Sequence, residues 1–280
     1  MYKGHYIIDA HCHIYPNKIA HKAALHISDF YEGLNYVGGD VTTLLDLMEQ
    51  QGIDYAVVNS AAMTPHQVES VNRFLLESAQ AHPDKFAPVG SVHPDCTDAE
   101  LDAGIHYLTD NGFHGLKLHP DMIQVALDDP RMLRIYARCQ EAGLTVLLHT
   151  GDPRYDYSNP NRLEPVVKQF PRLTIVGGHF AGRDFFREAA DRMHGYPNIF
   201  ADCSSSFSAM SMEDILYCIR TFGTDKLMFG TDYPVMLPFE DRDYMFRFGL
   251  SETELDDMLW RNAARIYKLT PPWCAENTAH

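Results

Sequence analysis

Residues 7–13 of this 280-residue chain read Ile-Ile-Asp-Ala-His-Cys-His, an apolar run that ends at two histidines one residue apart. The run predicts a short buried strand, and side chains at positions i and i+2 of a strand point to the same face. His11 and His13 can therefore present two imidazoles to one point, whereas Cys12 points to the opposite face as a packing residue. This geometry suits a metal ion, although such a short pattern also occurs where a strand runs into a polar loop.

Outward from this stretch, short apolar runs alternate with amphipathic segments. We expect strands at 7–13, 54–59, 86–92, 115–118, 144–148, 173–178, 198–202 and 226–231. We expect helices at 42–51, 68–81, 97–110, 129–143, 163–170 and 184–194, one that begins near 211, and one at 251–267. Strands separated by single helices are typical of βα units, and eight such units predict a (β/α)8 TIM barrel of the α/β class.

An open doubly wound sheet is the alternative fold. It would normally carry a glycine-rich phosphate loop after its first strand, where this chain has two histidines instead. We therefore expect one TIM-barrel domain over residues 1–280, with a short C-terminal tail from about 268. A long loop is expected at about 14–40, and loops of that length are often lids or binding loops.

Composition narrows the classes of partner. Hydrophobic residues make up 45% of the chain, which is ordinary for a globular protein, and the formal net charge of −15 disfavours nucleic acid and anionic membranes. We see neither a secretory leader nor an apolar run of membrane-spanning length. The six scattered cysteines are interpreted as mostly buried thiols, so we expect a cytoplasmic protein.

Polar residues gather where the predicted strands end, and histidine ends five of the eight. The residues are His11, His13, His93, Lys117, His119, His149, His179 and Asp232. Because the active site of a TIM barrel lies at the carboxyl ends of its strands, these positions predict one shared site. Imidazole and carboxylate are good zinc ligands, a bound zinc would make hydroxide from water at neutral pH, and Asp232 would accept the proton.

Together these motifs resemble the amidohydrolase superfamily. The resemblance rests on His11-x-His13, His149, His179 and the Gly-Thr-Asp-Tyr-Pro string at 230–234. The strings Gly-Leu-Lys-Leu-His-Pro at 115–120 and Leu-His-Thr-Gly at 148–151 resemble its amidohydrolase-related (amidohydrolase 2) branch of metal-dependent TIM-barrel hydrolases. The resemblance covers about residues 6–267.

The resemblance implies a ligand set. His11, His13, His149 and Asp232 would hold one divalent metal, zinc first and manganese as the alternative. Asp232 would also move a proton between the attacking water and the leaving group. His179 would lie near the metal and polarise the substrate carbonyl or hold the water; a core histidine that satisfies a neighbouring strand is the less favoured alternative.

Lys117 leaves two alternatives open. In some superfamily members such a lysine is carboxylated and bridges two metals, with the histidines after the fifth and sixth strands on the second metal. In its Lys-Leu-His-Pro context we favour one metal and a free Lys117 that faces the substrate, with His119 on the same face. His93 and Arg154 are further candidates for substrate binding, and each is also readily explained as a turn or loop residue.

Two more residues carry lower weight. Arg183, near the start of a helix, would suit an anion, and Asp202 would orient a ligand histidine from behind. We expect no nucleic acid or membrane partner, and a homodimer is a family expectation.

The leading hypothesis is an enzyme: a metal-dependent hydrolase of a small amide, lactone or other ester. The alternative within the family is a metal-dependent, non-oxidative decarboxylase or hydratase of a small unsaturated or aromatic carboxylic acid. In either case the substrate is a small molecule and can be a carboxylate. Two other classes stay open, namely a metal-free aldolase-type barrel with Lys117 as Schiff-base nucleophile, and a non-catalytic binding barrel.

Overall fold

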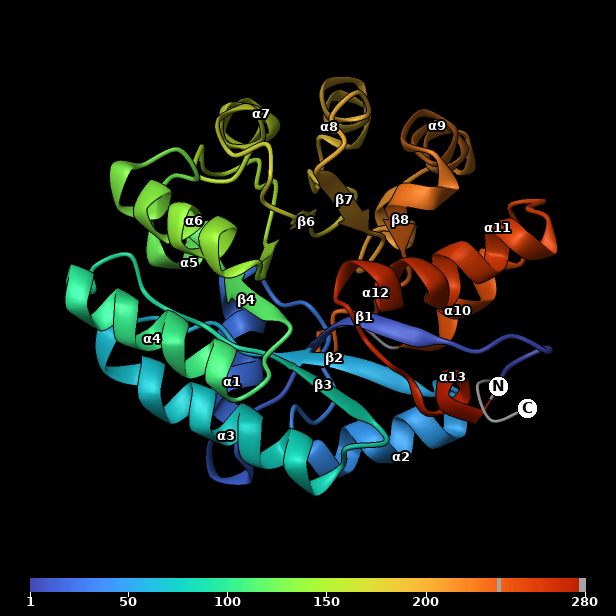
Figure 1. The fold of residues 1–280 in the computed structure, drawn as a ribbon. Coiled ribbons are helices and arrows are strands. Elements are labelled where there is room, and N and C mark those ends of the chain that lie inside the picture. The colour runs from blue at the N-terminus through green and yellow to red at the C-terminus, as the bar shows by residue number, and fades with distance from the viewer. Residues whose placement is uncertain (236–237, 277–280) are drawn as a thin grey trace.

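The computed structural model describes residues 1–235 and 238–276, and in this part of the chain eight parallel strands alternate with helices (Figure 1). The strands are β1 (Ile8–His13), β2 (Tyr55–Asn59), β3 (Phe86–Val89), β4 (Gly115–Leu118), β5 (Thr145–Leu148), β6 (Ile175–Gly177), β7 (Ile199–Asp202) and β8 (Leu227–Met228). Each lies within its predicted range. The predicted TIM barrel is confirmed.

The strands follow one another around the barrel in chain order. Strands β1 to β3 and β4 to β8 form two hydrogen-bonded sheets, each in consecutive order. Single parallel bridges join them, between Gly90 and Leu116 on one side and between Cys12 and Tyr233 on the other. The Ala10 amide also donates to the Phe229 carbonyl at 2.9 Å. Because both seams are bridged, the sheet is a nearly closed barrel and not an open doubly wound sheet.

Most helices match the predictions. They are α2 (Val41–Gln51), α3 (Val68–Ala81), α4 (Asp98–Asp110), α6 (Pro130–Ala142), α7 (Pro160–Gln169), α8 (Phe186–Met193) and α9 (Met212–Phe222). The predicted last helix is interrupted by a π-helical turn, giving α11 (Glu252–Asp256), η4 (Asp257–Arg261) and α12 (Asn262–Ile266). Short 3-10 turns are η1 (Pro65–Gln67), η2 (Phe207–Ala209) and η3 (Thr224–Lys226).

Local capping signals account for the accuracy of these boundaries. Thr97 and Glu100 form a capping box at the start of α4, as do Ser251 and Glu254 at α11. Gly52 caps the end of α2 with φ 67°, a left-handed conformation that glycine adopts without a Cβ penalty.

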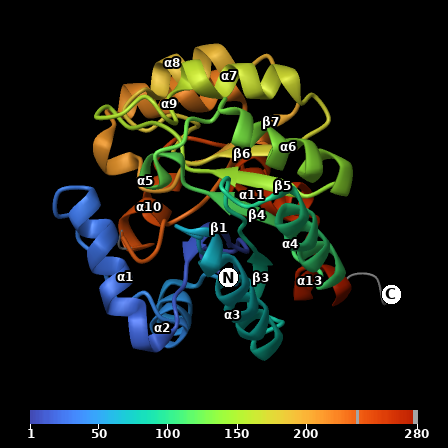
Figure 2. The ribbon, with the colours of Figure 1, turned by 90° about the vertical axis from the view of Figure 1, so that its left-hand side faces the viewer.

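The expected loop at about 14–40 is corrected, because it contains α1 (Asn17–Phe30). Pro16 sits at the N-cap, and the alanines and isoleucines of the segment recur at helical spacing, a signal that its histidines and flanking Tyr-Pro-Asn obscured. Figure 2 shows α1 (dark blue) on the same side of the barrel as α5 (Pro120–Ile123) and α10 (Pro238–Met245). The segment after β1 is therefore an ordered wall over the strand ends.

The C-terminal end also holds more structure than expected. Helix α13 (Pro272–Glu276) lies within the predicted tail, and residues 277–280 fall outside the described residues. No helix in the described part of the chain combines the length and apolar character that a membrane crossing needs.

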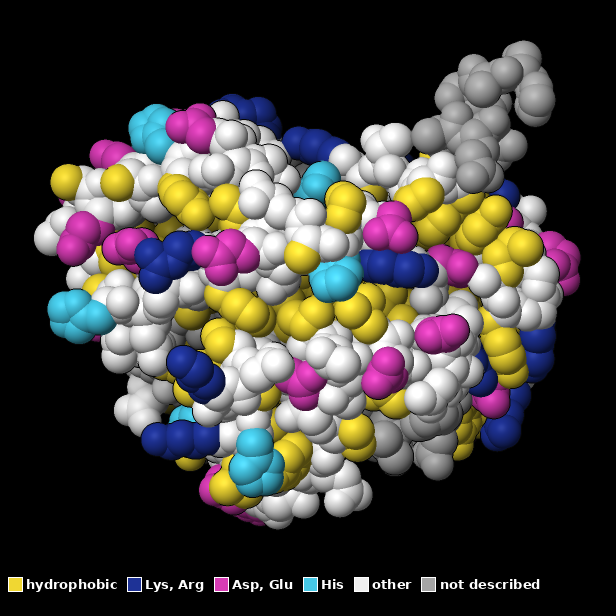
Figure 3. All heavy atoms as spheres, turned by 90° about the horizontal axis from the view of Figure 1, so that it is seen from below, with side chains coloured by type: hydrophobic (Ala, Val, Ile, Leu, Met, Phe, Trp, Pro, Cys, Tyr) yellow, Lys and Arg dark blue, Asp and Glu magenta, His cyan; other side chains and the backbone are white. Residues whose placement is uncertain are grey.

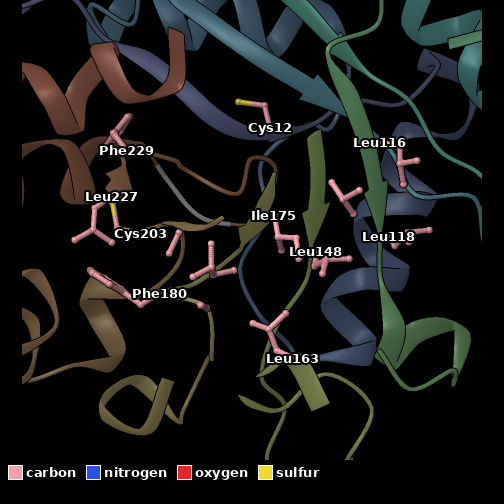
Figure 4. Packing of buried hydrophobic residues seen from close by; sticks show 14 of the residues in the cluster. Cys12, Leu116, Leu118, Leu148, Leu163, Ile175, Phe180, Cys203, Leu227 and Phe229 are labelled. Atoms are coloured by element: carbon pink, nitrogen blue, oxygen red, sulfur yellow. The ribbon is translucent and has the colours of Figure 1, made fainter. Parts of the chain in front are cut away.

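The buried hydrophobic residues form two clusters, an inner one within the barrel and an outer one between the strands and the helices. Ile8 and Ala10 belong to the inner cluster, whereas Cys12 packs in the outer one. Figure 4 shows members of the outer cluster, including Leu116 and Leu148. The predicted packing role of Cys12 is therefore confirmed.

A register shift in β1 brings its histidines inward. Side chains alternate along a regular strand, so Ile8 and Ala10 would place His11 and His13 on the outer face. The pairing of β1 with β2 shifts between Asp9 and Cys12, which is a β-bulge or similar irregularity. The shift turns both histidines toward the barrel axis.

Candidate metal centre

Four histidines and one carboxylate from four strands converge at the carboxyl end of the barrel. His11 and His13 come from β1, His149 follows β5, His179 follows β6 and Asp232 follows β8. Each of these residues is at most 8% exposed. Because burying polar side chains is unfavourable unless they are partnered, this cluster requires a specific network.

The donor atoms lie at distances that suit one metal ion. Among the described residues, His11, His179 and Asp232 form a group whose potential ligand atoms all lie within 4.8 Å of one another. The Asp232 Oδ1 atom is 3.6 Å from His11 Nε2 and 3.2 Å from His13 Nε2. Ligand atoms bound tetrahedrally at about 2.1 Å from a zinc ion lie about 3.4 Å apart. The spacing and the nitrogen and oxygen donors both fit a divalent metal.

Protonation favours metal binding as well. Burial lowers the pKa of both His13 and His179 to about 4, so both imidazoles are neutral at pH 7. Burial opposes the ionisation of Asp232, but the hydrogen bond with His13 and the electrostatic attraction of the neighbouring histidines together outweigh burial and hold the pKa of that carboxyl well below its usual range. Neutral imidazoles and an ionised carboxylate are the forms that ligate cations.

Asp202, at the end of β7, holds His11 in place. Its Oδ2 lies 3.0 Å from His11 Nδ1, and both side chains are fully buried. A hydrogen bond at Nδ1 leaves Nε2 to face the centre of the site. Gly178 and Gly230 flank the ring, and an added Cβ would come within 3.2 Å and 3.1 Å of His11 atoms. Glycine at both positions therefore makes room for His11.

Lys117 lies inside the cluster. It is fully buried, and its Nζ is 2.8 Å from His11 Nε2. Burial lowers the pKa of Lys117 to about 8, although the carboxylates of Asp232 and Asp202 oppose that shift. Lys117 thus contacts the nitrogen that a metal would use, a position close enough for either the bridging or the substrate-facing role.

His119 and His149 meet through a residue that the sequence did not single out. Their rings stack with centroids 4.1 Å apart, and Tyr31 Oη lies 2.9 Å from His119 Nε2 and 3.0 Å from His149 Nε2. On the other side, His149 Nδ1 is 3.1 Å from His179 Nε2, and His179 Nδ1 donates to the Ser204 carbonyl at 2.8 Å. A chain of hydrogen bonds therefore runs from α1 into the metal cluster.

The other two predicted substrate-binding residues, His93 and Arg154, make no hydrogen bond with the site histidines in the described part of the chain. The His93 ring is 3.2 Å from the Asp95 amide and has no recorded contact with the other site histidines among the described residues. Arg154 is paired with Asp152 at 2.7 Å and lies over the rings of Phe30 and Tyr31. Its charge is already neutralised, so it serves to hold the end of α1.

Arg183 is a cation at the inner end of the cavity above the cluster. It lines that cavity together with His119 and His149, and its guanidinium carbon is 5.8 Å from the Tyr31 ring centroid. From the sequence, Arg183 was only a lower-weight candidate for anion binding, because it lies near the start of a helix.

Comparison with known proteins identifies the family. A family model described as amidohydrolase matches residues 8–269. The chain belongs to the amidohydrolase family. The predicted resemblance is thereby confirmed.

Relatives of this amidohydrolase-family chain include several decarboxylases. It is 21% identical over 241 residues to the 2-amino-3-carboxymuconate-6-semialdehyde decarboxylase of Dictyostelium discoideum, a match that spans 72% of this chain and 66% of that relative, just under two thirds of its length. Its fold matches the 5-carboxyvanillate decarboxylase of Sphingomonas paucimobilis, with a TM-score of 0.75, 17% identity, and 95% and 99% of the two chains covered.

A third comparison includes a metal. The dihydroxybenzoic acid decarboxylase of Polaromonas sp. JS666, solved with bound manganese and the inhibitor 2-nitroresorcinol, matches with a TM-score of 0.71 and 16% identity, covering 95% of this chain and 97% of that one. At such identities the structural likeness shows a shared fold. The relatives favour the decarboxylase alternative over the leading hydrolase hypothesis.

Serine residues after β7 also escaped sequence analysis. Ser205 Oγ donates to Asp232 Oδ2 at 2.7 Å, and Ser204 Oγ lies 3.0 Å from His11 Nδ1. The Ser-Ser-Ser run at 204–206 directly after a strand end was the available signal, since every such loop of a TIM barrel reaches the site.

Proposed function

We propose that this protein is a metal-dependent, non-oxidative decarboxylase of an unsaturated or aromatic carboxylic acid. The observation that carries the proposal is the buried donor set of His11, His13, His179 and Asp232 in a chain whose relatives include decarboxylases. Arg183 and His119 line the same cavity and supply donors for a substrate carboxylate. On a chain with a formal net charge of −15, such local donors are needed to attract an acid.

The metal would be held by His11, His13 and Asp232, with a fourth ligand from the pair His149 and His179. The sequence favoured His149 as this ligand, whereas the group of closely spaced ligand atoms contains His179. The two histidines are neighbours, with His179 Nε2 3.1 Å from His149 Nδ1. Zinc and manganese both accept imidazole and carboxylate ligands. When bound, the metal would coordinate the substrate and stabilise the negative charge that develops as the carbon–carbon bond breaks.

Asp232 would move the proton. Its carboxylate is held by His13 at Oδ1 and by Ser205 at Oδ2, so its position is fixed. It would take a proton from solvent and deliver it to the substrate carbon that carries the carboxylate. The carbon–carbon bond then breaks, its electron pair stays with the substrate carbon framework, and carbon dioxide leaves. The reaction consumes one proton and no water.

Metal content is the first test. Protein purified without chelators or a metal-affinity tag should contain about one zinc or manganese per chain by mass spectrometry, and the His11→Ala/His13→Ala variant should contain little. Separate His149→Ala and His179→Ala variants identify the fourth ligand by which one loses metal. Two metals per chain would instead indicate a carboxylated, bridging Lys117.

Product analysis tests the reaction itself. The metal-loaded protein should release carbon dioxide from members of a panel of hydroxybenzoic and unsaturated dicarboxylic acids. A parallel panel of amides, lactones and esters should remain intact. Hydrolysis in the second panel without carbon dioxide from the first would overturn the proposal in favour of a hydrolase.

A further inference from the structure

The cavity above the metal cluster extends well beyond it. Its volume is about 610 Å³, and its inner end is lined by His13, His119, His149, Arg183 and Asp232. From there it continues outward between α1 and the segment that contains η1 and α3. One cavity thus joins a polar end, where the chemistry takes place, to a second compartment.

The cavity is larger than a single-ring acid requires. A protein cavity of ~150 Å³ is sufficient to hold benzene. A benzoate at the inner end would therefore leave most of the 610 Å³ unfilled. Pockets of this size usually bury most of a considerably larger ligand.

The α1 wall of the outer compartment is one continuous helix face. Its cavity-lining residues recur at helical spacing: Lys18, Ile19, Lys22, Ala23, His26 and Ile27. The buried face of α1 consists instead of the small residues Ala20, Ala24 and Ser28. An amphipathic helix normally buries its large apolar residues against the core. Here Ile19, which is 50% exposed, and Ile27 face the cavity, so they are available to a ligand.

The opposite wall is mainly apolar, with Gln67 and Ser70 as its polar lining residues. Met63, Val71 and Phe74 line it, the last two from α3. Figure 3 views the molecule from the side where α2, α3 and α4 lie in Figure 1, and hydrophobic side chains are exposed there between charged ones. Lys18 and Lys22 are exposed, so their ammonium groups reach water while their stems border the apolar space.

From these walls we infer that the substrate acid carries an apolar substituent of several carbons, which lies between α1 and α3. The inference rests on the proposed function, because the carboxylate and the reacting carbon are taken to bind at the inner end. An alkyl chain would bury apolar surface against Ile27, Val71 and Phe74, whereas a polar substituent would lose hydration against these three side chains.

A series of inert ligands tests the inference. Calorimetric titration of the metal-loaded protein with benzoate and with 4-alkylbenzoates from methyl to hexyl gives a Kd for each. We expect the Kd to fall about threefold to fourfold for each added methylene until the compartment is filled. A Kd that stays constant along the series, or rises, would overturn the inference.

A matched pair of variants tests where the alkyl chain of the ligand binds. Ala23→Phe fills the outer compartment and should reduce the ratio of the benzoate Kd to the hexylbenzoate Kd at least tenfold. Leu25→Phe places the same side chain on an exposed part of α1 outside the cavity lining and should leave both Kd values unchanged. A ratio that Ala23→Phe does not alter would show that the alkyl chain binds elsewhere, and would likewise overturn the inference.

Carbon dioxide release from 2,6-dihydroxybenzoate and its 4-alkyl derivatives separates this inference from the proposed function. Release from the parent acid without a gain for the alkyl derivatives contradicts the inference alone. Tight binding of alkylbenzoates without carbon dioxide from any acid contradicts the proposed function and leaves the apolar compartment supported.

Discussion

The two ends of the cavity are built on different principles. The inner end is formed by residues that follow the strands, such as His13 and Asp232, which are buried and linked by hydrogen bonds. The outer end is formed by helices, and Ile19 there is half exposed. Strand ends are fixed by the barrel's hydrogen-bond ladder, whereas α1 is joined to the barrel through a few small residues. We therefore expect the inner end to set the reaction and the outer end to select the substrate.

The largest effect is expected from removing the proton carrier at the inner end. Asp232→Asn should lower kcat for carbon dioxide release by a factor of about 10²–10⁴, the usual contribution of a general acid or base. The control is Asp110→Asn, at an exposed position at the end of α4, which should leave kcat unchanged. Retention of more than a tenth of the activity by the Asp232 variant would remove its proposed role.

A smaller effect, on metal affinity, is expected from Asp202, which lies behind the ligand His11. Asp202→Asn keeps the shape of the side chain but weakens its contact with His11 Nδ1. Such supporting contacts are worth about 10- to 100-fold in metal affinity. Competition with a chelating dye measures that affinity, and an unchanged value would show that Asp202 does not orient His11 for metal binding.

Tyr31 lies between the two ends of the cavity, so the loss of its hydroxyl should lower kcat less than the loss of the Asp232 carboxylate. Tyr31→Phe deletes the hydroxyl between His119 and His149, and the loss of one or two hydrogen bonds lowers kcat by about tenfold. Tyr36→Phe is the matched control, because it also removes a tyrosine–histidine contact, at 3.3 Å to His21, but on the surface. Equal effects of the two variants would contradict a specific role for Tyr31.

The last prediction concerns how the stability of the metal-free protein depends on pH. Burial holds the pKa of His13 and His179 at about 4, below the ordinary 6.5, so the unfolded chain binds more protons than the folded one between these values. Stability should therefore fall as pH drops from about 6.5 to about 4. Thermal melts of the wild type and of a His13→Gln variant measure this. A dependence that is equally steep in the variant would assign the effect to other groups.

Sequence analysis predicted the residues at the inner end of the cavity but missed the helix and the tyrosine at its outer end. At the inner end, strand periodicity and the position of each histidine after an apolar run were sufficient to predict His11, His13, His179 and Asp232 as neighbours. At the outer end, α1 was expected to be a loop, and Tyr31 was not singled out. The tyrosine follows no strand, and its partner His119 lies 88 residues away in the chain. No local pattern encodes such a contact.

By itself, the sequence determined the order of strands and helices, the barrel, and the residue types that line its carboxyl end. These properties follow from side-chain periodicity and capping, which act over a few residues. The tertiary structure alone decided that β1 shifts register to turn its histidines inward, that His179 contacts His149 while it forms one group with His11 and Asp232, and that α1 borders an apolar compartment. Each of these depends on packing between segments distant in the chain, where distances of a few tenths of an ångström decide which atoms meet.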